Sequence, residues 1–261
     1  MNIQYQNPGF EHSINSILLF QDEALSPFWT DSLFYFYPQI QKDEWIIRNT
    51  DGKRQYLTEI LSGVYQSLQQ ELAQKVSAYN RHFSLHQAQI QDALSDAFSL
   101  DSRLIFNDIV ANITLNPICP RFLQEHTFDV FYKNSPHGAL GSSLHEIIHF
   151  FWFHVWYNHF GDGLDTYESP SLKWILSEMV VECIMRDHRL SSINPYFPRE
   201  NGGCVYSYFQ SMQIEAQPIL ETMDRMYRSN TITDFMELAY RYCQQHEQAI
   251  RLHIQRSENG E

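Results

Sequence analysis

The chain contains the segment His145-Glu146-Ile147-Ile148-His149, whose residue types and spacing suit metal chemistry. On an α-helix, residues four apart lie on one face, so the two imidazoles would point the same way. Two imidazoles placed in this manner can bind one zinc ion at about 2.0–2.1 Å. Glu146 lies beside the pair, where its carboxylate can reach a metal-bound water without binding the metal itself. We therefore expect His145 and His149 to bind zinc and Glu146 to act as a general base, because zinc lowers the pKa of such a water towards about 7.

The apolar surroundings of this segment favour a metal site over a chance pattern. Residues 143–160 carry apolar side chains nearly all round, which predicts a central, buried helix that ends at the glycines of residues 161–163. Two histidines and a glutamate without partners in such a helix would cost several kcal/mol, and a metal ion would supply the partner. A metal-free helical protein with a satisfied polar core remains an alternative.

A catalytic zinc site needs a third protein ligand. The metzincin extension of the pattern fails, because Trp152 stands where its glycine belongs and Val155 where its third histidine belongs. A later predicted helix, about residues 171–189, carries Glu178 and Glu182 on one face of an otherwise apolar stretch. One carboxylate on the metal, with the other accepting the N–H of a metal-bound imidazole, would satisfy both groups.

The motif followed by two carboxylates on a later helix resembles the gluzincin group of zinc peptidases, the thermolysin-like superfamily, over roughly residues 103–190. The resemblance implies that Glu178 is the third zinc ligand and that Glu182 is the outer carboxylate. It also implies a zincin-like fold, in which a small β-sheet packs on the active-site helix, and hydrolysis of a peptide or protein substrate. Ser177 replaces the asparagine of the thermolysin type and Glu182 its usual aspartate, so no close subfamily is indicated.

Gluzincins also use a downstream tyrosine or histidine to stabilise the oxyanion of the tetrahedral intermediate. Tyr206 and His188 are the catalytic candidates here, with Tyr208 as a further possibility. A turn at residues 201–203 would bring a tyrosine near the metal. Residues two apart on a helix face different ways, so at most one of the two tyrosines can serve. Ordinary packing is the competing interpretation for each of these side chains.

The rest of the sequence predicts a predominantly helical α+β protein. A helical N-terminal portion, residues 1–100, would precede a zincin-like metallopeptidase portion, residues 101–261. Residues 1–54 read as irregular because prolines and a turn interrupt them. Periodicity predicts strands at 103–115 and 128–132, and helices at 56–79, 84–98, 143–160, 171–189, 203–227 and 231–255.

Composition excludes several classes of partner. The formal net charge is −13, which repels phosphate backbones and disfavours both nucleic acids and anionic membranes. The most apolar run, residues 147–157, is too short to cross a bilayer. The N-terminus lacks the basic region and apolar core of a signal peptide, so we expect a cytoplasmic protein. The four cysteines show no C-x-x-C spacing and read as reduced thiols.

Two function classes that use the metal remain open. The first is a zinc-dependent peptide hydrolase in which Glu146 activates the zinc-bound water. The second is a catalytically inactive zinc-binding scaffold or interaction protein with a zincin fold. The presence of Glu146 favours the hydrolase, because a purely structural zinc site has no need of a general base.

Overall fold

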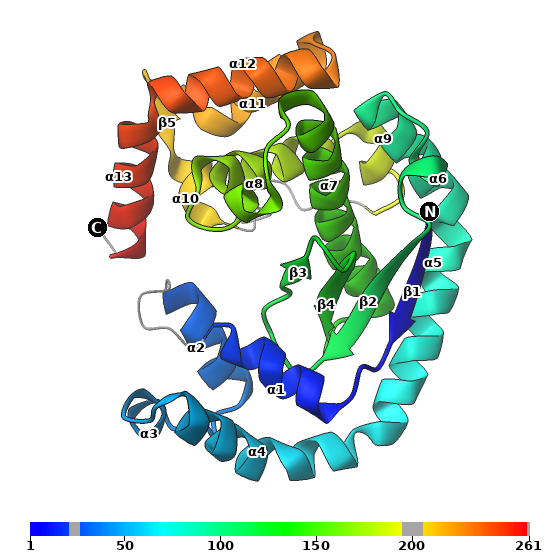
Figure 1. The fold of residues 1–261 in the computed structure, drawn as a ribbon, viewed down its shortest axis with the longest axis vertical. Helices are drawn as coiled ribbons and strands as arrows, with labels where there is room; N and C mark the ends of the chain where they lie inside the picture. The colour runs from blue at the N-terminus through cyan, green and yellow to red at the C-terminus, as the bar shows by residue number, and fades with distance from the viewer. Residues whose placement is uncertain (21–26, 195–205, 260–261) are drawn as a thin grey trace. The chain divides into compact units, whose positions relative to one another are not determined.

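Helices make up most of the computed structural model, which describes residues 1–20, 27–194 and 206–259 (Figure 1). A small mixed sheet accompanies them, which confirms the predicted α+β class with helices predominant. The chain divides into two units that are each discontinuous in sequence. Unit 1 comprises residues 1–85 and 106–143, and unit 2 comprises residues 86–105 and 144–261. This division differs from the predicted boundary near residue 100, because the long helices α5 (Gln69–Phe98) and α7 (Pro136–Phe160) each contribute to both units.

Unit 1 contains the sheet, whose strand order is β1-β2-β4-β3. The β1–β2 and β2–β4 pairs are parallel, and the short edge strand β3 is antiparallel to β4. The predicted strand at 128–132 is confirmed as β4. The predicted strand at 103–115 is too long at its start, because the first residues form helix α6 of unit 2. The strands are β1 (Asn2–Gln6), β2 (Asp108–Thr114), β3 (Arg121–Phe122) and β4 (Thr127–Phe131), and α6 is Ser102–Ile105.

The described residues between 1 and 54 form a strand and several helices, so the prediction of irregular structure there was wrong. Ile3 and Tyr5 alternate with exposed residues along β1, and this strand obtains its backbone partners from β2, far away in sequence. The predicted helix at 56–79 is interrupted at Leu68, where one helix ends and the next begins. The helices are α1 (Phe10–Leu18), α2 (Pro27–Phe36), α3 (Lys42–Ile46), α4 (Thr50–Ser67) and α5 (Gln69–Phe98).

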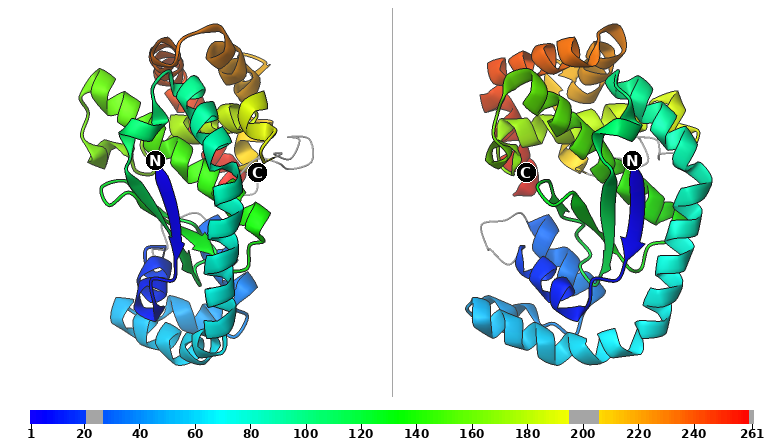
Figure 2. Two further views of the ribbon diagram at one scale, coloured as in Figure 1. Left: turned by 90° about the vertical axis from the view of Figure 1, so that its right-hand side faces the viewer. Right: turned by 45° about the vertical axis from the view of Figure 1, so that its right-hand side comes forward.

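Helices cover both faces of the sheet in unit 1. On one face, the Tyr5 hydroxyl lies 2.6 Å from Ser143 Oγ in α7, and the Tyr5 backbone makes two hydrogen bonds with the Asn80 side chain in α5. Figure 2 shows this part of α5 running alongside β1. On the other face, His12 of α1 contacts Asp129 of β4. Tyr5 and Asp129 therefore both find polar partners in the helices that cover the sheet.

The described residues of unit 2 are helical apart from one short hairpin. The predicted helix at 203–227 was wrong, because β5 and β6 separate two helices there. The hairpin turn places Glu215 and Ala216 at positive φ without a glycine, so the local sequence gives little turn signal. Residues 203–205 of that prediction lie outside the described residues. Besides α6 and the end of α5, unit 2 contains most of α7 (Pro136–Phe160) and the elements that follow it: η1 (Leu164–Tyr167), α8 (Leu172–Met185), α9 (His188–Ser191), α10 (Ser207–Ser211), β5 (Gln213–Ile214), β6 (Gln217–Pro218), α11 (Ile219–Ser229), α12 (Ile232–Gln245) and α13 (Glu247–Glu258).

Helix α8 forms the centre of unit 2. Ser171 caps its first turn by accepting a hydrogen bond from the Trp174 amide. Every residue of the helix except Lys173 is buried, and α11 and α12 pack against it (Figure 1). The 144–160 part of α7 is likewise apolar on nearly all sides, with Trp152 and Trp156 fully buried. No helix in the described part of the chain is long and apolar enough to span a membrane.

Candidate metal centre

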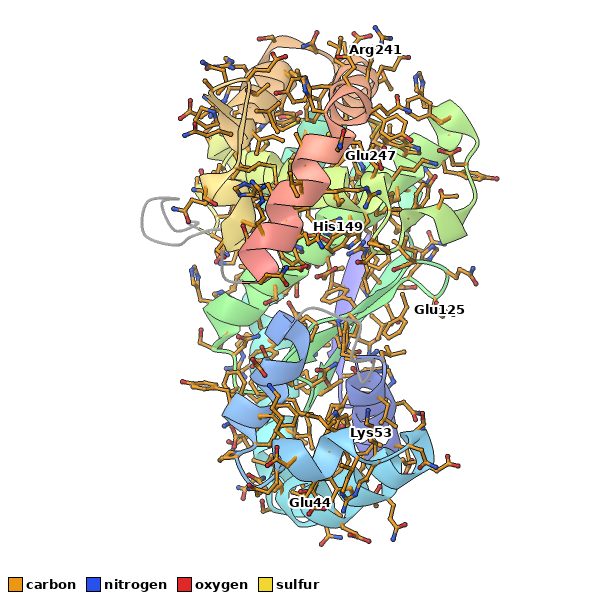
Figure 3. All side chains as sticks on the ribbon, turned by 90° about the vertical axis from the view of Figure 1, so that its left-hand side faces the viewer. Glu44, Lys53, Glu125, His149, Arg241 and Glu247 are labelled. Atoms are coloured by element: carbon orange, nitrogen blue, oxygen red, sulfur yellow. The ribbon has the colours of Figure 1, made fainter. Side chains whose placement is uncertain are left out.

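Helix α7 brings the two histidines of the motif together. Their spacing of four residues places both side chains on one face, and the Nε2 atoms of His145 and His149 lie 3.1 Å apart. The His149 side chain is completely buried, whereas that of His145 is 13% exposed. Figure 3 labels His149 among the helices of unit 2. The pair therefore has one enclosed member and one that borders the solvent.

Glu178 reaches this pair from α8. Its Oε2 atom lies 3.3 Å from His145 Nε2, and its Oε1 atom lies 3.3 Å from His149 Nε2. Ligand atoms about 2.0–2.1 Å from a tetrahedral zinc ion would lie roughly 3.3–3.4 Å from one another. The two nitrogens are thus about as far apart as two ligands of one metal ion would be, and each lies at a similar distance from one oxygen of the Glu178 carboxylate.

Glu146 lies beside these three groups but farther from His145 than Glu178 does. Its Oε1 atom is 3.9 Å from His145 Nε2, and one ligand atom from each of Glu146, His145 and His149 falls within 4.8 Å of the others. The Glu146 side chain is buried. A carboxylate in this position can contact a water on the metal while Glu178 contacts the metal itself.

Burial, charges and hydrogen bonds act together on the pKa values of Glu178 and His145. Burial is the largest influence on Glu178 and would raise its pKa, but charge on His149 and hydrogen bonds from both imidazoles hold it well below its usual range. Burial is also the largest influence on His145 and would lower its pKa. The hydrogen bond to Glu178 and the charges of Glu146, Glu178 and Glu182 nevertheless raise it. Several buried carboxylates around two imidazoles therefore favour positive charge between them, which a metal ion would provide.

Glu182 lies one helical turn after Glu178 and is also buried. Its Oε2 atom lies 3.5 Å from an Arg186 guanidinium nitrogen, and its charge raises the pKa of His145. The predicted hydrogen bond from an imidazole N–H to Glu182 stays a prediction. Sequence reasoning missed Arg186, although its spacing of four residues from Glu182 on one helix was the available signal.

The structure separates the two oxyanion candidates. Tyr206 is buried, and its ring packs edge-on against Trp174, with 5.6 Å between centroids. Trp174 precedes Glu178 by one turn of α8, so Tyr206 lies near the helix face that carries Glu178.

His188 instead begins helix α9, and its side chain is 89% exposed and lies 3.3 Å from the Asp187 carboxylate. Tyr208 stacks on Tyr206, and its backbone carbonyl faces His253. The predicted turn at 201–203 lies outside the described residues.

No protein-family model, curated protein or solved structure matches the chain. The likeness to gluzincins therefore rests on the motif residues, and any function has to be argued from the geometry of these side chains.

Proposed function

We propose that this chain is a zinc-dependent peptide hydrolase in which His145, His149 and Glu178 bind the metal. The observation that carries the proposal is the convergence of the two imidazoles and the Glu178 carboxylate, with separations of 3.1–3.3 Å. The proposal includes a gluzincin type of site on a zincin-like fold. Its substrate class is the peptide or protein that the resemblance to gluzincins implies, and the net charge of −13 disfavours nucleic acid.

The types of donor favour zinc over other common metal ions. Calcium and magnesium prefer sites built from oxygen atoms, whereas two imidazoles and one carboxylate suit zinc. Three protein ligands are also the number found in catalytic zinc sites, which keep one position open for water or substrate. His145 borders the solvent and marks the side from which a substrate would approach.

When bound, zinc would acidify a water molecule and polarise the carbonyl of the scissile peptide bond. Glu146 then accepts the proton of the attacking water and passes it to the nitrogen of the leaving amine. Of the two oxyanion candidates, Tyr206 has the better position because it packs beside the turn of α8 that precedes Glu178. Its hydroxyl would donate a hydrogen bond to the developing oxyanion. His188 is the second candidate for this role.

A zinc-binding scaffold without turnover is the second candidate function. The observation that favours it is the strong enclosure of the site, because the side chains of Glu146, His149 and Glu178 are all buried. A catalytic site must admit an extended peptide, whereas a structural metal site is closed. Both functions require the same three ligands, so only turnover distinguishes them.

The test compares the wild type with Glu146→Gln on a broad peptide library in the presence of zinc. This substitution keeps the side-chain shape and the three ligands but removes the base. We expect the rate of peptide hydrolysis to fall by about 10²–10⁴-fold, which is the usual contribution of general acid–base catalysis. The zinc content should stay unchanged. Equal cleavage by the two proteins would contradict the mechanism. Zinc bound by both without cleavage by either would favour the scaffold.

A further inference from the structure

The ring of His149 belongs to a group of three nearly parallel rings. Its plane is inclined by 12° to that of Phe153, with 6.1 Å between the centroids. Phe153 in turn stacks on Tyr167, with centroids 4.3 Å apart and planes inclined by 15°. All three side chains are fully or almost fully buried. Phe153 therefore links the proposed metal ligand to a residue outside α7.

The spacing along the chain explains the first contact, and local hydrogen bonds explain the second. Phe153 follows His149 by four residues on α7, so the two side chains share one face. Tyr167 lies at the end of η1, and its hydroxyl donates a hydrogen bond to the Asp162 carbonyl over 3.3 Å.

Asp162 is itself fixed to both ligand-bearing helices. Its carboxylate accepts a hydrogen bond from Trp156 Nε1 of α7 and pairs with Lys173 Nζ of α8, each over 2.7 Å. The segment that carries Tyr167 is thereby held against both helices, and Tyr167 is held against Phe153.

We infer that Phe153, supported by Tyr167, is a positioning residue that sets the plane of the His149 ring for metal binding. This role rests on the proposed function. An imidazole nitrogen binds a metal through a lone pair in the plane of the ring, so the ring plane decides whether His149 Nε2 points at the ion. The side-chain torsion that rotates this ring has broad minima and does not fix the plane by itself. A flat, buried neighbour restricts that rotation, as hydrogen bonds to the second ring nitrogen do in many metal sites.

Simple core packing is the rival explanation, and α7 offers a matched control for it. Phe151 is the same residue type on the same helix and is also fully buried. It packs against Phe98, which is not a proposed ligand, with centroids 5.6 Å apart. A loss of packing alone should therefore affect Phe151→Leu and Phe153→Leu alike.

The experiment measures three quantities for the full chain and both variants. These are the zinc affinity by competition with a chromophoric chelator, the visible absorption spectrum after cobalt substitution, and the free energy of unfolding without metal. We expect both variants to lose similar stability. Phe153→Leu alone should weaken zinc binding by about 10–100-fold, the usual size of an effect transmitted through a ligand, and should shift the cobalt bands. Phe151→Leu should keep the wild-type affinity and spectrum.

Equal zinc affinities and identical cobalt spectra for the two variants would overturn the inference. If Phe153→Leu does not fold, Tyr167→Leu and Tyr167→Phe decide the question, because only the former removes the supporting ring. Tyr167→Leu should then weaken zinc binding more than Tyr167→Phe, which keeps the ring and loses only the hydrogen bond to Asp162; equal affinities would overturn the role. A wild type that binds no zinc would remove the proposed function and this role with it. If the wild type binds zinc tightly and Phe153→Leu binds it with the same affinity, only the role of Phe153 is overturned.

Discussion

The Oε1 atom of Glu178 lies 3.3 Å from the Nε2 atom of His149, although the two residues belong to different helices and both side chains are buried. Removing one partner of a buried polar contact typically costs about 1–3 kcal/mol. The pair thus ties α7 to α8 at the point where the proposed metal would bind. Stability and metal binding should both depend on it.

The two glutamates of α8 should differ in their effect on zinc. Both are buried on the same helix, so Glu178→Ala and Glu182→Ala are matched variants. Glu178→Ala removes a ligand, whereas Glu182→Ala removes a group that acts through its neighbours, where losses are typically about 10–100-fold. We expect the larger fall in zinc affinity for Glu178→Ala, measured by chelator competition. The opposite order would show that Glu182 binds the metal.

The hydroxyl of Tyr206 should matter for turnover and little for the fold. Tyr206→Phe keeps the ring that packs on Trp174 and removes only the proposed oxyanion donor. We expect kcat on a cleaved peptide to fall by about 10²–10³-fold, with zinc content unchanged. Tyr208→Phe, on the ring stacked against Tyr206, serves as the control and should keep its activity. Activity lost in His188→Ala but kept in Tyr206→Phe would transfer the role to His188.

The pair of His12 and Asp129 in unit 1 should make stability depend on pH. His12 Nε2 lies 2.9 Å from the buried Asp129 carboxylate. The hydrogen bond between them raises the pKa of His12; burial works against this rise, and the charge of Asp129 adds to it. A histidine whose pKa is higher in the folded state than in the unfolded state stabilises the fold. This stabilisation is complete below the pKa of the unfolded state, about 6.5, and is lost as the pH rises through the pKa of the folded state. The stability difference between wild type and His12→Gln should therefore be largest in acid and shrink towards alkaline pH. Urea unfolding at a series of pH values measures the difference in free energy of unfolding between the two proteins. A difference that does not change with pH would contradict the raised pKa of His12.

The elements that carry the site were predictable because their signals are local. Residues 144–160 of α7 are apolar nearly all round, and α8 shows the same composition, so both were recognisable as buried helices. Strand β1 was missed because its partner β2 is distant in sequence, and the β5–β6 hairpin because Glu215 and Ala216 lack the usual glycine. Tyr167 shows no sequence signal for its contact with Phe153, since only the folding of η1 back onto α7 creates it.

The central claim, that His145, His149 and Glu178 bind one zinc ion, is tested most directly by metal analysis of the protein purified without chelator or added zinc. The account predicts about one zinc per chain for the wild type and close to none for His149→Ala. The control is His154→Ala, which removes a histidine of the same helix that hydrogen-bonds to Asn158, and it should keep its zinc. A zinc-free wild type, or full zinc occupancy in His149→Ala, would contradict the account.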